Sequence, residues 1–81
     1  PVAVSSTLLY LSEVESTSLA EIARALGHPH QLVAQRIRIL DKLALISSEP
    51  DPDDGRRTLF RLTESGQRQG ELLQAYRRDA A

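Results

Sequence analysis

Residues 31–38 carry side chains whose chemistry suits the edges of nucleic-acid bases. Gln31, Gln35 and Arg38 are spaced by four and three residues, with Ala34 beside Gln35, so a helix would place them on one face. Glutamine can form two hydrogen bonds with adenine, arginine can form two with guanine, and an alanine methyl group can contact that of thymine. The same residues also suit the solvent-facing side of any amphipathic helix, since glutamine and arginine are good helix formers. The choice between base contact and a solvent-facing helix side therefore depends on the neighbouring segments.

A second candidate surface is the segment 51–57, which is rich in aspartate and ends on Arg56 and Arg57. An arginine at the tip of a hairpin is attracted by the negative potential of a narrow minor groove. Asp54 stands two residues before Arg56, where its carboxylate can hold the guanidinium in a bidentate pair. The alternative is a solvated surface ion pair that contributes little to stability.

Other kinds of chemistry have little support in this chain. The absence of cysteine excludes disulfides, thiolate zinc sites and thiol redox sensing within these residues. His28 and His30 lack a third ligand, so a capping or DNA-facing role is the better interpretation, and a protonated His30 would favour phosphate at a helix N-terminus. The aspartates of the loop do not fit the pattern of a calcium-binding loop. Gly55 stands at the fifth position, whereas the pattern has glycine at the sixth, and Leu62 stands at the twelfth, where a bidentate glutamate is needed. Without a catalytic motif, we expect no enzyme activity, no metal and no cofactor.

Composition sets further bounds. With 81 residues and a formal net charge of −1, one small domain is expected, and the net charge by itself does not indicate nucleic-acid binding. The charge is unevenly spread, since residues 28–45 carry three basic residues against one acidic residue: Arg36, Arg38, Lys42 and Asp41. No segment has the length of a membrane span or the pattern of a secretory signal, so a cytoplasmic protein without membrane contact is expected. The chain starts on Pro1 without a methionine, which suggests a piece of a longer protein.

The elements that would position these residues form a helix-turn-helix over residues 18–44. Ser18 and Glu21 have the spacing of a capping box, which starts a helix. Gly27 follows where a helix end favours a left-handed residue, and Pro29 suits the start of a second helix over 29–43. The second helix has a broad apolar arc made of Leu32, Val33, Ile37, Ile39, Leu40 and Leu43. In a helix-turn-helix the second helix lies in the DNA major groove. This arrangement favours contact of these side chains with base edges over an ordinary solvent-facing role.

The flanking segments complete a larger pattern. Residues 3–14 have helical periodicity, residues 45–50 suit a short strand, and residues 56–63 alternate like a second strand. Thr58, Phe60 and Leu62 share one face of that strand, and Arg57, Leu59 and Arg61 share the other. Residues 63–65 can start a last helix, which carries Leu72, Leu73 and Tyr76. The chain is therefore expected to be mainly α-helical with a β-hairpin wing over about 45–63, which is a winged helix-turn-helix spanning 1–81.

The run from Leu19 to Gly66 resembles the MarR family of bacterial transcriptional regulators. The resemblance lies in four motifs: LAEIARALG, RILDKLALI, DPDDGRR and RLTESG. It implies a winged-helix repressor that binds a palindromic DNA operator as a homodimer, often with release by a small phenolic effector. In this resemblance Asp54 and Arg56 occupy the wing positions of an Asp-x-Arg pair, with Arg57 beside them. The positions that face the major groove are then Pro29, His30, Gln31, Ala34, Gln35 and Arg38.

The sequence departs from the family pattern in three ways. Ala44 stands where the family has glycine, and a left-handed alanine there would cost roughly 1 kcal/mol. Arg36 lies within the apolar arc, from which it can extend to a phosphate or bond the first helix. The family's proteins are longer at both ends, where their dimer is built. Two alternatives therefore stay open: a winged-helix module for protein interaction, and a domain of a larger protein of the acetyltransferase type.

Overall fold

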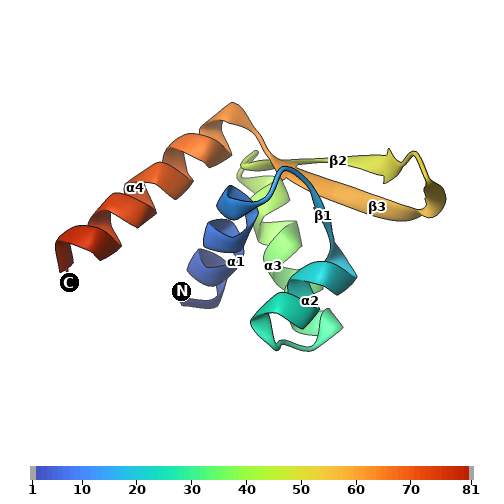
Figure 1. Cartoon of the computed structure of the whole chain (residues 1–81), viewed down its shortest axis with the longest axis horizontal. Helices are drawn as coiled ribbons and strands as arrows, with labels where there is room; N and C mark the ends of the chain where they lie inside the picture. The colour runs from blue at the N-terminus through green and yellow to red at the C-terminus, as the bar shows by residue number, and fades with distance from the viewer. Residues whose placement is uncertain (1, 81) are drawn as a thin grey trace.

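The computed structural model describes the backbone of residues 2–80 and the side chains of residues 4–77. This part of the chain folds into four helices and a small antiparallel sheet, and it confirms the predicted winged helix (Figure 1). The elements, in order, are α1 Val2–Glu13, β1 Thr17–Ser18, α2 Leu19–Leu26, α3 His30–Lys42, β2 Ile46–Asp51, β3 Asp54–Leu62 and α4 Glu64–Ala80. The short strand β1 was not predicted, since two residues carry no periodicity.

The sheet has the strand order β1-β3-β2. Strands β2 and β3 pair from Ile46 opposite Leu62 outwards to the turn, with an irregularity at the Pro50–Asp51 step. Strand β1 covers only the inner end of β3, where Ser18 lies opposite Leu59. The outer half of the hairpin is therefore a two-stranded ribbon that projects away from the helices (Figure 1).

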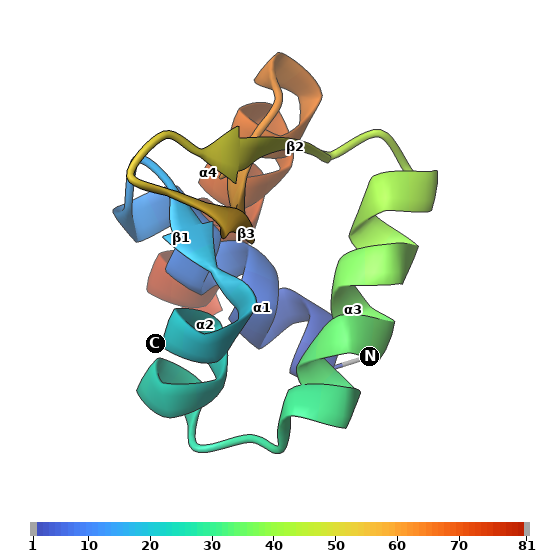
Figure 2. The ribbon, with the colours of Figure 1, turned by 90° about the vertical axis from the view of Figure 1, so that its right-hand side faces the viewer.

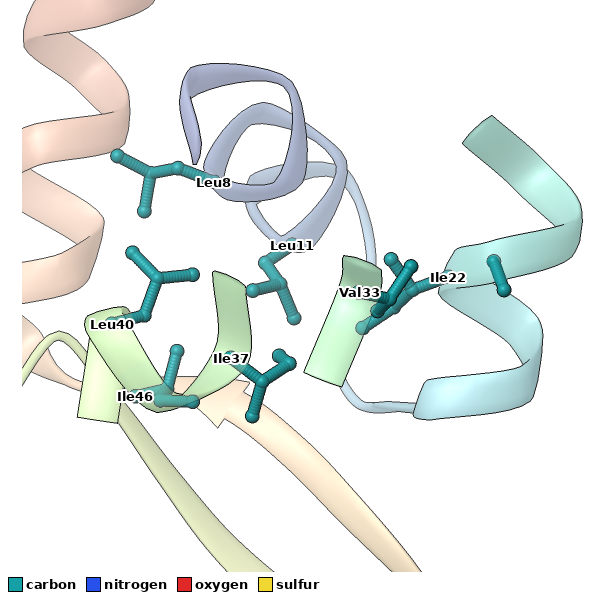
Figure 3. Packing of buried hydrophobic residues seen from close by; sticks show 8 residues of the cluster. Leu8, Leu11, Ile22, Val33, Ile37, Leu40 and Ile46 are labelled. Carbon is teal, nitrogen blue, oxygen red and sulfur yellow. The ribbon is translucent and has the colours of Figure 1, made fainter. Parts of the chain in front are cut away.

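The core lies between the first three helices and the base of the hairpin. Its buried apolar side chains are Leu8, Leu11, Ile22, Ala23, Val33, Ile37, Leu40 and Ile46 (Figure 3). The predicted apolar arc of α3 is too broad, because Ile39 and Leu43 are exposed. Helix α3 packs on α1, α2 and β2 from one side only, so residues at the edge of the arc remain in contact with solvent. Thr58 is also exposed, since the projecting ribbon has no core beneath it.

The helix ends follow the predicted signals with two adjustments. The Ser18 side chain accepts a hydrogen bond from the backbone of Glu21, whose carboxylate accepts one from the Ser18 backbone, so the capping box is confirmed. Gly27 is left-handed with φ of 67°. Pro29 has an extended ψ of 149° and is the N-cap, so α3 begins one residue later than expected. It also ends one residue earlier, because Leu43 leaves the helical conformation.

Candidate nucleic-acid interface

The predicted base-reading residues lie together on the outer side of α3. His30, Gln31, Gln35 and Arg38 are exposed, and Ala34 is half-buried. The buried side chains of this helix point into the opposite side, toward α1 and α2 (Figure 3). Figure 2 shows α3 at the edge of the molecule, where its outer side is uncovered. The helix therefore presents amide and guanidinium groups to solvent, and these groups are of the kinds that can pair with base edges.

The N-terminus of α3 is open. Pro29 is exposed at the N-cap and offers no capping side chain, and its carbonyl accepts the first helical hydrogen bond from Val33 at 3.2 Å. The first N–H groups of an α-helix have no acceptor within the helix and carry the positive end of its dipole. This end of α3 can therefore accept an anionic group such as a DNA phosphate.

Arg36 is less exposed than the polar residues Gln31, Gln35 and Arg38 of the same helix. Its Nε is buried and has no hydrogen-bond partner among the described residues. It stands on the flank of α3 between the buried Ile37 and the exposed Gln35. The sequence suggested either a bond to the first helix or an extension to phosphate, and no bond of Nε to α1 is present in the described part of the chain.

The wing tip holds Arg56 by way of Asp54. The Asp54 Oδ1 atom accepts from the backbone N–H of Arg56 at 3.1 Å and from its Nε at 3.3 Å. The predicted pair therefore exists, but it uses one carboxylate oxygen and is not bidentate, because the same oxygen also closes the backbone turn. The Arg56 side chain is 93% exposed. Its remaining guanidinium nitrogens are directed to solvent, where a phosphate or a groove edge can reach them.

Arg57 is placed differently from its neighbour. Its Nη2 lies 2.9 Å from Oε1 of Glu21 in α2, and its Nε lies 3.3 Å from Oδ2 of Asp51 across the hairpin. The same Glu21 oxygen accepts from the backbone N–H of Ser18 at 3.2 Å and from its hydroxyl at 3.0 Å. Arg57 thus connects both strands of the wing to the first helix of the helix-turn-helix.

The environment of Glu21 favours its charged form. The hydrogen bonds from the side chain and then the backbone of Ser18, followed by the charge of Arg57, hold the pKa of the Glu21 carboxyl below its usual range against the opposing effect of partial burial. Sequence reasoning found Glu21 only as a capping residue. Its contact with Arg57 joins positions 36 residues apart, and no short-range pattern carries such information.

Two other classes of site can be addressed within the described residues. No group of three histidine, aspartate or glutamate side chains there comes together in a way that could hold a metal ion. Nor does any helix in the same part of the chain have the length and hydrophobicity to cross a membrane.

Comparison with known proteins identifies the family. The sequence model of the MarR family matches residues 1–57. The chain belongs to the MarR family. A search of curated protein sequences finds no match.

Solved structures share the fold of this MarR-family chain. A probable transcriptional regulator from Pseudomonas aeruginosa has 30% identity and a TM-score of 0.87, over 94% of this chain and 58% of its own. A mutant of MepR from S. aureus has 28% identity and a TM-score of 0.90, over 95% and 58%. FabT from Streptococcus pneumoniae, in complex with DNA, has a TM-score of 0.89 over 98% and 55%, and its 14% identity shows the fold alone.

The MarR-family chain spans just over half the length of these structures. The family model ends within the wing, so it covers α1 to α3 and both candidate surfaces. The shared part is thus the winged helix-turn-helix, a domain typical of DNA-binding transcriptional regulators.

Proposed function

We propose that this MarR-family domain binds double-stranded DNA in a sequence-specific manner as part of a transcriptional regulator. Helix α3 would lie in the major groove, and the wing tip 51–57 would reach the flanking minor groove. The observation that carries the proposal is the pairing of two exposed features: the amide-rich outer side of α3, and Arg56 held by Asp54 at the end of a projecting hairpin. The DNA complex of FabT, which has the same fold, supports it.

Different residues would contact the bases and the phosphates of the DNA. Gln31, Gln35 and Arg38 would make hydrogen bonds to base edges, and the Ala34 methyl group would contact thymine. Pro29 and His30 would lie against phosphate at the open N-terminus of α3. Such phosphate contacts position the protein and supply most of the affinity, whereas the base contacts select the sequence.

The protein that contains this domain would work as a homodimeric repressor in the cytoplasm. Two copies related by twofold symmetry would read a palindromic operator whose half-sites lie about one helical turn apart. A small phenolic effector would release the DNA, as the family resemblance implies. This part of the proposal rests on the family resemblance, and this chain spans just over half the length of each structural relative.

Binding to mixed-sequence duplex DNA, titrated with salt, tests the proposal. We expect affinity to fall steeply as salt rises, because each neutralised phosphate releases a counterion. Arg56→Ala should weaken binding across many sequences by about tenfold, in the range of one good groove contact. Arg68→Ala is the control, since Arg68 is an exposed arginine on α4 that pairs with Glu64. Equal affinity of the parent and Arg56→Ala for all duplexes would contradict the role of the wing.

The net charge of −1 is compatible with one alternative, a winged-helix module that binds another protein. Sedimentation alongside the DNA titration separates the two. A stable dimer with no affinity for duplex DNA at low salt would support the protein-interaction module and contradict DNA binding by this domain.

A further inference from the structure

Arg57 of the wing forms an ion pair with Glu21 of α2, with 2.9 Å between Nη2 and Oε1. We propose that Arg57 is a positioning residue, which holds the wing at a set distance from the helix-turn-helix and thereby decides where Arg56 meets the DNA. This assignment replaces the sequence-based expectation that Arg57 itself contacts DNA. It rests on the proposed DNA-binding function.

The outer part of the hairpin needs such a contact because the third strand of the sheet does not extend that far. Strand β1 pairs with β3 only at Phe60 and Leu59, and beyond that point the ribbon has two strands. A two-stranded ribbon is marginally stable by itself. Arg57 lies two residues further out, about 7 Å along the strand. Since it also contacts Asp51 on β2, it ties both strands of the ribbon to α2.

The anchor on α2 is itself held in place. The Glu21 oxygen that accepts from Arg57 also accepts from the backbone N–H and the hydroxyl of Ser18. These bonds restrict the rotamer of Glu21, so its carboxylate has a defined position at the start of α2. Helix α2 in turn packs on α3 through the core residues Ile22 and Val33 (Figure 3). The chain of contacts therefore runs from the base-reading helix to the wing.

The two neighbouring arginines are suited to different roles. Arg56 is 93% exposed and Arg57 is 48% exposed, and successive side chains of a strand point to opposite faces. Arg57 directs Nε and Nη2 at carboxylates, so turning to a phosphate would require it to give up both partners. Arg56 has only Asp54 and keeps its outer nitrogens available.

The position of the wing can be measured without DNA. The chain has no cysteine, so Ala25→Cys in α2 and Asp53→Cys at the wing tip, both exposed positions, give one pair of spin labels. We expect a narrow distance distribution in the parent and a clearly broader one with Arg57→Ala. Glu21→Gln should broaden it less, since glutamine still completes a capping box and accepts a neutral hydrogen bond. Adding Glu21→Gln to Arg57→Ala should bring no further change.

Arg61→Ala is the matched control for this measurement. Arg61 lies on the same strand, is 47% exposed, and pairs with Glu49 inside the hairpin at 3.7 Å. Its removal should leave the distance distribution as in the parent. A distribution that stays narrow with Arg57→Ala would overturn the proposal, provided that thermal unfolding shows the variant to be folded.

Salt titration on a labelled mixed-sequence duplex separates positioning from direct contact. We expect Arg57→Ala to weaken binding about twofold to fivefold, as the loss of an exposed ion pair would, with the salt slope of the parent. A phosphate ligand would instead lower the slope by about 0.9, and Arg57→Lys would restore binding because lysine also neutralises phosphate. A lower slope with full rescue by lysine would overturn the proposal. If the parent does not bind duplex DNA at low salt, the proposed function fails, while the label distances still decide whether Arg57 holds the wing.

Discussion

Two carboxylates set the directions of the arginines on the wing. Asp54 acts on Arg56 from two residues away, through a turn in which its oxygen also accepts a backbone N–H. Glu21 acts on Arg57 from another element, 36 residues away in the chain. The first contact could be predicted from the sequence because its geometry is local. The second depends on how the hairpin lies against α2.

Ala44 is the one non-glycine residue with positive φ in the described backbone, at 59°. The sequence by itself left this conformation open, and the structure shows that Ala44 adopts it. The Ala44 carbonyl accepts a hydrogen bond from the Thr63 hydroxyl at 2.7 Å. We expect Ala44→Gly to raise the free energy of unfolding by about 1 kcal/mol, because glycine has no Cβ to clash in this conformation. Denaturant unfolding measures the change. The same substitution at the exposed helical position Ala25 should lower stability, and a decrease at Ala44 would contradict the prediction.

Glu21 should make stability depend on pH in the acidic range. Since the pKa of its carboxyl is lower in the folded chain than the usual 4.5, its contribution is fully present above that value. It is lost as pH falls through the lowered pKa of the folded state. Glu21→Gln keeps the cap but not the charge, so the parent should be more stable near neutral pH and the difference should vanish at low pH. Unfolding measured over a pH series tests this, and a constant difference would count against it.

Among the helices, α4 depends on two glycines for its close approach to the domain. Thr63 starts the helix by accepting the N–H of Gly66 at 3.1 Å. A Cβ at Gly66 would collide with the backbone oxygen of Leu45, and one at Gly70 would lie 3.2 Å from the Cβ of Ser12. The spacing of the two glycines is compatible with close packing or with tolerance on an exposed face. Gly66 and Gly70 are both buried, so they serve close packing and are not on an exposed face.

Gly66→Ala should therefore destabilise the domain by about 1–3 kcal/mol, the usual cost of overpacking. The blocking atom belongs to the backbone and cannot rotate away. Gly70→Ala should cost less, because its neighbour is a side-chain atom at a tight but tolerable distance. Thermal unfolding of the two variants gives the comparison. A larger loss at Gly70 than at Gly66 would show that α4 adjusts differently from what these contacts imply.

The domain as a whole is elongated, with extents of 41 × 26 × 20 Å. Figure 1 shows α4 and the wing extending in opposite directions from the three core helices. Leu72 and Tyr76 on α4 are exposed. Gly70, Leu73 and Gln74 face α1 or the core, whereas Leu72 and Tyr76 stand on another side of the same helix, where the domain does not cover them.

Self-association of the chain should depend on this exposed part of α4. If the proposed homodimer uses it, Leu72→Gln should weaken concentration-dependent dimerisation in sedimentation equilibrium, because burial of a leucine contributes about 1.5–3 kcal/mol. Leu43→Gln is the control, an exposed leucine just beyond α3. Equal dimerisation of the parent and Leu72→Gln would place the dimer contact elsewhere.

The order of the helices and of the two hairpin strands, the caps and the turns could be read from the amino-acid sequence, because each of these signals acts within a few residues. The capping box at Ser18, the left-handed Gly27 and the hairpin turn before Arg56 are of this kind. The exposure of Ile39 and Leu43, the burial of the α4 glycines and the Glu21–Arg57 contact were decided only by the tertiary structure. Periodicity shows which side chains share a face, but packing against distant segments determines how much of that face is covered and which charges meet.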